Sequence, residues 1–477
     1  MSAKKKDGIP SASSRTNGAD LKRALSWVLC DGIFDKVRLH GNATWTAVAL
    51  VQLAVFWVWR PETSLVAAAD SAVDLVRAIY GAVPVGSYQA LVKVLKRYSS
   101  QLLPLLWCRL HRLMEECDEE KWRVGLWLAL AMDGSRVSVP RTERNEQRFC
   151  KPAQGKKKSQ RKNKRSRHAK QKRATARQKS HYDPQAVGPQ MWLTMIWHLG
   201  LSLPWSWKTG PSYSSERAHV LEMLEQQTFP ENTLFCGDAG FVGYDFWREI
   251  RARGHHFLVR VGGNVRLLKR LGYVREYEGI VYCWPDAAAK KQQPPLVLRL
   301  LHFRDRRGEV YLVTSVLNKK ALTDVQASEI YRRRWGIEVQ FRSLKQTFQR
   351  SKLRSRSPAC AEIELHWSLL GLWMIQLLAI KERTRFGDPD DHTSVATAIR
   401  IIRNMMNNHS ATRPNNRSLS VQLTEATTDD YRRRSRKKSR NYPRRKEEPS
   451  AGKPKMRMAS PWHQQKLRQL QNLGTAA

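Results

Sequence analysis

The stretch TLFCGDAGFVGYDFWREIRARGHHFLVRV, residues 233–261, contains a complete strand–helix–strand pattern. It begins with a short, largely apolar run that ends at Asp238, and it finishes with HHFLVRV, a second run of strand-forming residues. Between them, GYDFWREIRARG has the spacing of an amphipathic helix, and Gly254 is a residue type that commonly closes helices. Because parallel strands need a crossover connection, strand, helix and strand in this order predict a parallel pair. The sequence therefore predicts an α/β protein.

The segment before this unit predicts a second acidic strand end. VGLWLALAM, from Val124 to Met132, is a short unbroken apolar run that stops at Asp133 and Gly134, which favours a strand buried on both faces. RVSVP predicts a further strand directly after it. In α/β sheets, functional groups collect at the carboxyl ends of strands, so Asp133 and Asp238 are candidates for one site. The alternative is that each aspartate only forms a turn or caps a helix.

Three further segments extend this pattern. MWLTMIWHLG, after Pro189, predicts another strand, and residues 216–227 predict a helix. Residues 262–323 contain short alternating runs separated by turn residues, which predict an antiparallel β section.

The stretch YRRRWGIEVQFRSLK, from Tyr331 to Lys345, places one carboxylate among five cations. On a straight helix, Tyr331, Arg334, Glu338 and Lys345 share one narrow stripe beside an apolar stripe. A carboxylate held among phosphate-binding groups suits a metal ligand next to a nucleic-acid backbone. Together with the two aspartates, it could bind two divalent ions. A surface ion pair of Glu338 with Arg334 or Arg342 is the alternative.

These motifs resemble those of a known family. The spacing of Tyr331, Arg334, Glu338 and Lys345 resembles the tyrosine–arginine–glutamate–lysine signature of DDE transposases of the insertion-sequence-four family. DGSRVSVP and GDAGF resemble that family's first and second aspartate motifs, in the same order. The resemblance covers roughly residues 124–345.

The resemblance implies a fold and an activity. The fold is α/β, with a ribonuclease-H-like catalytic core of mixed sheet, an antiparallel β insertion and an N-terminal helical region. The activity is metal-dependent DNA strand cleavage and strand transfer at the terminal inverted repeats of an insertion sequence. The implied cofactor is Mg²⁺, two ions, with Mn²⁺ as a substitute. The implied partners are double-stranded transposon ends and target DNA, with a homodimer on the paired ends.

The resemblance also implies residue roles. Asp133, Asp238 and Glu338 form the catalytic, metal-binding triad. Arg334 and Lys345 contact phosphates near the cleaved end, and Tyr331 braces or contacts the DNA there. Trp284, in the β insertion, is a candidate for stacking on a flipped base, and the alternative is an ordinary buried aromatic.

The charge of the chain points to the same kind of partner. The 477 residues include 84 Lys and Arg against 42 Asp and Glu, a formal net charge of +42. Such an excess predicts a polyanionic partner, nucleic acid first and an anionic membrane as the alternative. Two basic blocks, Lys156–Lys179 and Arg432–Arg457, are too dense in like charge to fold alone.

The compartment is expected to be the bacterial cytoplasm, in association with the nucleoid. The seven cysteines have no CxxC spacing, which favours reduced thiols over a disulfide or zinc framework. The basic N-terminus has no apolar segment directly behind it, which predicts no secretory signal. Trp45–Trp59 is apolar but short for a membrane span, so we expect a buried helix.

The length predicts two to four domains. The predicted organisation is a disordered N-terminus (1–20), a helical region with a DNA-binding role (21–118), a ribonuclease-H-like core (119–146 and 182–261), a basic insert (147–181), a β insertion (262–323), the rest of the core with C-terminal helices (324–410) and a basic disordered tail (411–477).

Two alternative functions stay open. One is a catalytically inactive or domesticated DNA-binding protein that retains the transposase fold. The other is a basic protein that coats nucleic acid without any site, which is difficult to reconcile with acids placed at strand ends.

Overall fold

The structure, a computed structural model, describes residues 16–30, 32–151, 188–305, 308–387, 393–411, 417–427 and 452–474. They form two compact units. The helical unit takes its residues from 16–122, 342–348 and 363–427, and the sheet unit from 123–341, 349–362 and 452–474. The basic block Lys156–Lys179 lies outside the described residues.

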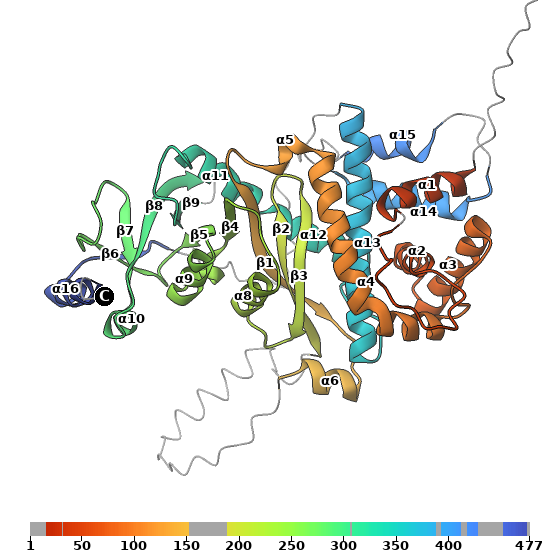
Figure 1. Ribbon diagram of the computed structural model, residues 1–477, viewed down its shortest axis with the longest axis horizontal. Helices are drawn as coiled ribbons and strands as arrows, with labels where there is room; N and C mark the ends of the chain where they lie inside the picture. The colour runs from red at the N-terminus through yellow and green to blue at the C-terminus, as the bar shows by residue number, and fades with distance from the viewer. Residues whose placement is uncertain are drawn as a thin grey trace, which may run out of the picture. The chain divides into compact units, whose positions relative to one another are not determined.

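One mixed sheet organises the sheet unit (Figure 1). Its first part has the order β3-β2-β1-β4-β5. β1 and β2 are antiparallel, as are β2 and β3, whereas β4 is parallel to both β1 and β5. The bounds are β1 (Leu128–Ser138), β2 (Gln190–His198), β3 (Leu203–Pro211), β4 (Thr233–Gly237) and β5 (His256–Val261). The predicted α/β class and the parallel pair around residues 233–261 are confirmed.

The β insertion continues the same sheet. β9 pairs with β5, and β8, β7 and β6 follow, all antiparallel to their neighbours. The bounds are β6 (Arg266–Lys269), β7 (Ile280–Cys283), α10 (Asp286–Lys290), β8 (Leu296–Asp305) and β9 (Gly308–Thr314). The predicted antiparallel section at 262–323 is confirmed.

The predicted disordered tail at 411–477 is wrong for the residues that the structure describes. β10 (Lys455–Met458) pairs in parallel with β6, and α16 (Pro461–Gly474) packs beside α10. α15 (Leu419–Thr424) belongs to the helical unit. The charge density of this region did not reveal two short segments that pack on other elements: β10 completes a sheet edge, and Leu467 of α16 is buried.

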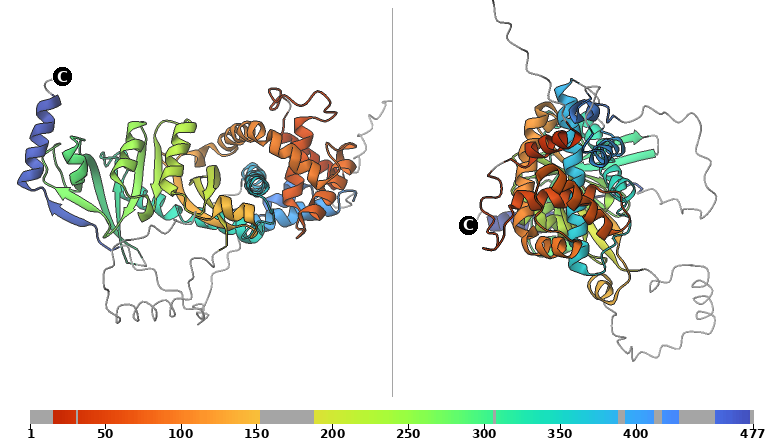
Figure 2. Two further views of the ribbon diagram at one scale, coloured as in Figure 1. Left: turned by 90° about the horizontal axis from the view of Figure 1, so that it is seen from below. Right: turned by 90° about the vertical axis from the view of Figure 1, so that its right-hand side faces the viewer.

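Helices cover both faces of the sheet. α8 (Glu216–Gln226) and α9 (Tyr244–Ala252) lie on one face, and α11 (Asp324–Arg333) and α12 (Gly336–Arg342) lie on the other (Figure 2). The end of α9 is as predicted, because Gly254 has the left-handed φ of 79° that glycine adopts at little cost. Two shorter helices, α6 (Glu143–Phe149) and η1 (Ala239–Phe241), complete the unit.

The helical unit combines N-terminal helices with helices from the later part of the chain. Its helices are α1 (Asn17–Val28), α2 (Ala47–Trp59), α3 (Leu65–Tyr80), α4 (Tyr88–Cys117), α5 (Glu119–Trp122), the π-helix η2 (Ser343–Thr347), α13 (Pro358–Arg385, from Ile363 onward), α14 (Val395–Asn407) and α15. The predicted helices at 21–118 are therefore confirmed, although they do not form a separate region. The indole N–H of Trp59 donates to Gly371 O at 2.9 Å, and α1 packs on α14.

Two helices of this unit are strongly apolar. α2 is buried almost throughout, which confirms the buried helix predicted at Trp45–Trp59. α13 is long and apolar enough to cross a membrane by composition, but 89% of its apolar window is buried inside the structure. That burial is typical of the central helix of a bundle.

Candidate active site

The first two predicted acids lie side by side, Asp133 on β1 and Asp238 directly after the neighbouring β4. The parallel pairing of β1 with β4 ends at Ala131 and Cys236, and each aspartate follows two residues later. Asp133 and Asp238 therefore sit at the same level of strands ~4.8 Å apart. One prediction was wrong: Asp133 does not end a strand, because β1 continues to Ser138 along β2.

Each aspartate is fixed by the backbone of its own motif. The Gly134 N–H donates to Asp133 Oδ1 at 2.8 Å, and the Gly240 N–H donates to Asp238 Oδ1 at 2.8 Å. These short local bonds set the rotamer of each carboxylate. Each bond uses one oxygen of the carboxylate, so the second oxygen faces the neighbouring side chains.

The predicted straight helix over Tyr331–Lys345 was wrong. α11 ends at Arg333, and Arg334 and Trp335 form a tight turn whose N–H groups donate to carbonyls three residues back. α12 then begins at Gly336, where a Cβ atom would lie 2.7 Å from Cζ3 of the buried Trp197 on β2. The absent side chain lets the bent segment close onto the sheet. The predicted apolar stripe is buried as expected, at Ile330, Ile337, Phe341 and Leu344.

Arg334 links two of the three acids. Its Nη1 lies 3.8 Å from Asp133 Oδ2, and its Nη2 lies 3.4 Å from Glu338 Oε1. The guanidinium is 5.7 Å from the ring centre of Tyr331, and the side chain is only 12% exposed. The ion pair between Glu338 and Arg334, which was the alternative, is thus present. The largely buried guanidinium also lies within ion-pair distance of Asp133, and a simple surface ion pair would not require this second acid.

The electrostatics show that the acids are crowded. Burial raises the pKa of Asp133 to about 6, and the carboxylates of Asp238 and Glu338 add to this rise. The Gly134 N–H and the Arg334 guanidinium oppose it. Carboxylates held close together in a partly desolvated site favour the protonation of one of them or the binding of a cation between them.

A fourth acid, Glu216, completes this crowding and was not predicted as a site residue. Burial raises its pKa to about 7, with Asp133 and Asp238 as the next causes. In the sequence it looked like an ordinary residue at the start of a helix. The only signal was the glycine that follows each aspartate, which leaves space for another side chain.

Two candidates remain, Lys345 and Trp284. Lys345 is on η2, in the helical unit, where burial lowers its pKa. Trp284 is 3% exposed inside the β insertion, and its Nε1 donates to Gln293 O at 2.7 Å. Its position agrees with the alternative of a buried aromatic, and the base-stacking role stays a prediction.

The donor set fits a hard divalent cation. Among the described residues, no three Asp, Glu, His or Cys side chains already converge closely enough to chelate an ion. Carboxylate oxygens are nevertheless the ligands that Mg²⁺ prefers. The guanidinium of Arg334, between Asp133 and Glu338, shows that a positive charge is accommodated there.

Comparison with known proteins assigns the family. The family model described as "Transposase DDE domain" matches residues 128–374. The chain belongs to this family. The matched span begins with β1 and includes Asp133, Asp238 and the whole segment from Tyr331 to Lys345. The predicted membership of the DDE transposase family is therefore confirmed.

Comparison with individual proteins gives two matches. Over 213 residues the chain is 28% identical to the transposase InsG for insertion sequence element IS4 of Escherichia coli (strain K12), a match covering 42% of this chain. It spans about half of that relative, 47% of its length. Among solved structures, a cryo-EM structure of the piggyBac transposase synaptic complex with hairpin DNA matches with a TM-score of 0.39 and 10% identity, covering 88% of this chain and 87% of that one. That likeness is distant.

Proposed function

We propose that this DDE family member is a transposase that cleaves DNA and transfers strands at the terminal inverted repeats of an insertion sequence. The observation that carries the proposal is the position of Arg334 between the motif acids Asp133 and Glu338, with Asp238 beside Asp133 at the same level of the sheet. Asp133 lies on β1 and Asp238 directly follows the neighbouring β4, and one guanidinium lies within 4 Å of both Asp133 and Glu338.

The catalytic core is, in this proposal, ribonuclease-H-like. The strand order β3-β2-β1-β4-β5 supports this, with three antiparallel strands followed by two that run parallel to β1. The β insertion, which follows β5 in the chain and precedes Glu338, agrees with the organisation that the family resemblance implies.

Transposases of this family use divalent metal ions, and we propose two Mg²⁺ ions, replaceable by Mn²⁺, held by Asp133, Asp238 and Glu338. When bound, such ions activate water or a 3′-hydroxyl and stabilise the leaving oxygen in phosphodiester displacement. The protein's own contribution is to fix the acids through the Gly134 and Gly240 N–H groups and to keep them partly dry. Arg334, braced by Tyr331, balances the acids before DNA arrives and then binds a phosphate of the cleaved end.

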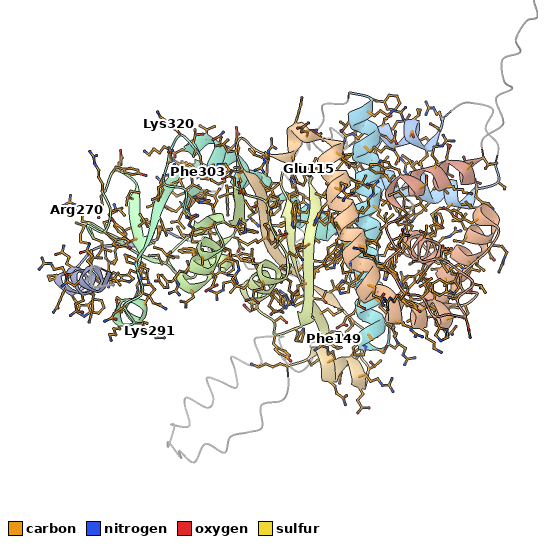
Figure 3. The ribbon with its side chains drawn as sticks, in the orientation of Figure 1. Glu115, Phe149, Arg270, Lys291, Phe303 and Lys320 are labelled. Carbon is orange, nitrogen blue, oxygen red and sulfur yellow. The ribbon has the colours of Figure 1, made fainter. Side chains whose placement is uncertain are left out.

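The proposed partner is double-stranded DNA, both transposon ends and target. The net charge of +42 supports it, and basic side chains such as Arg270, Lys291 and Lys320 project outward from the sheet unit (Figure 3). Lys345 and the two basic blocks add further phosphate contacts in this proposal, so DNA affinity falls steeply with salt. We also propose a homodimer on the paired ends, and a cytoplasmic protein associated with the nucleoid.

A strand-cleavage assay tests the proposal. The full chain is incubated with Mg²⁺ and the DNA ends that flank its own gene, beside the variant Glu338→Gln and the control Glu329→Gln, an exposed acid on α11. We expect cleavage by the native chain and by the control, and none by Glu338→Gln, which still binds DNA. Tight binding without cleavage by any of the three would support the inactive DNA-binding alternative.

A further inference from the structure

Glu216 lies in the space that the two aspartate motifs leave open. A Cβ atom at residue 134 would lie 2.8 Å from Glu216 Cδ, and one at residue 240 would lie 3.7 Å from Glu216 Oε2. The same position at residue 240 would be 3.0 Å from Asp238 Oδ1. The carboxylate of Glu216 thus extends over Gly134 toward Asp238.

Local structure fixes this placement. Ser215 caps α8 through the Ala218 N–H, so Glu216 is the first residue of the helix, and its side chain points back past the helix end. One turn later, His219 Nδ1 is 2.9 Å from the hydroxyl of the buried Thr194. Thr194 is the β2 partner of Gly134. A buried hydrogen bond therefore anchors α8 beside the aspartate strand.

A purely structural role explains this position poorly. An acid in the first turn stabilises a helix by interaction with its dipole, but an exposed carboxylate does that equally well. The nearby cations Arg136 and Arg217 act on Glu216, but each acts less strongly than either aspartate, and the Arg217 Nη1 also donates to Val242 O at 2.6 Å. Placing a third carboxylate beside two aspartates is unfavourable unless a cation joins them.

We propose that Glu216 is a fourth carboxylate of the metal centre. Its carboxylate would help Asp133 and Asp238 to hold a divalent ion and would increase the affinity of the site for that ion. The inference rests on the proposed function, since the ion is the one that the transposase uses.

Calorimetric titration of the full chain with Mn²⁺, without DNA, tests this inference. We compare the native chain with Glu216→Gln, Asp238→Asn and the control Glu225→Gln. Glu225 is nine residues along α8, about half a turn away in angle, and pairs with Arg253 at 3.5 Å. We expect Glu216→Gln to bind Mn²⁺ at least ~10-fold more weakly and Glu225→Gln to bind as the native chain does.

The outcomes separate the two proposals. Native affinity in Glu216→Gln, with weakened binding in Asp238→Asn, would overturn the role of Glu216 and leave the transposase intact. No Mn²⁺ binding by the native chain would overturn both. If Glu216→Gln fails to fold, Glu216→Asp replaces it: the shorter carboxylate should weaken binding, and unchanged affinity would overturn the inference. In the cleavage assay, the Mg²⁺ concentration for half-maximal rate should rise in parallel.

Discussion

Replacing Asp133 by Asn should stabilise the metal-free protein at neutral pH. Burial and the neighbouring acids raise the pKa of Asp133 from its ordinary 3.8 to about 6, so the folded chain favours the protonated form. In the unfolded chain the group ionises near pH 4. Ionisation of Asp133 therefore lowers the free energy of unfolding as the pH rises through the window from about 4 to 6, and the loss persists above it.

The size of the effect follows from the same values. A rise of the pKa from 3.8 to about 6 corresponds to about 3 kcal/mol. The Asp133 side chain is only 18% exposed, so solvent screens little of this. Asn keeps an oxygen for the Gly134 N–H and carries no charge. We expect Asp133→Asn to be more stable than the native chain by up to ~3 kcal/mol at pH 8 and by far less at pH 4.

Urea unfolding in EDTA, followed by fluorescence of the 17 Trp, measures this difference at pH 4 and pH 8. Glu225→Gln is the control for removing a distant acid. Added Mg²⁺ should stabilise the native chain and have little effect on Asp133→Asn, because the ion relieves the same repulsion. A stability change that is equal at both pH values, or a loss of stability at pH 8, would refute the view that burial and the neighbouring acids disfavour the charged form of Asp133.

Three further changes test separate features of the site. Gly336→Ala places a methyl group against Trp197 and should shift α12, reducing cleavage by ~10-fold or more while circular dichroism stays native. Arg334→Lys removes the fork that reaches two acids and the stacking on Tyr331, so cleavage should fall at least ~10-fold although Mn²⁺ titration still detects the ion. Trp284→Ala should cost ~3 to 5 kcal/mol in thermal or urea unfolding; a native-like stability with loss of cleavage alone would instead support base stacking.

Much of the fold could be predicted because its signals are local. Residues 233–261 carry their own strand, helix and strand, and the glycine that ends α9 has the expected backbone. β10 and α16 were missed because their order depends on β6 and α10, distant in sequence. Charge density alone does not show whether a basic segment finds a partner.

The site residues that belong to a sequence motif could be predicted. The features that depend on contacts between distant parts of the chain could not. Asp133, Asp238 and Glu338 follow from spacing. The bend at Arg334 and Trp335 does not, because it depends on Gly336 meeting Trp197 of β2. Glu216 was missed for a similar reason: only the fold brings the start of α8 over Gly134.

The parallel pairing of β10 with β6 has a consequence for synthesis of the chain. β6 is translated long before residues 455–458, so a nascent chain carries an uncovered strand edge while the intervening residues are made. Open edges recruit other strands, including those of neighbouring copies on the same messenger. The free edge of β6 is covered only when β10 has been made and has paired with it. Chains that terminate before β10 would keep this edge open and would tend to associate.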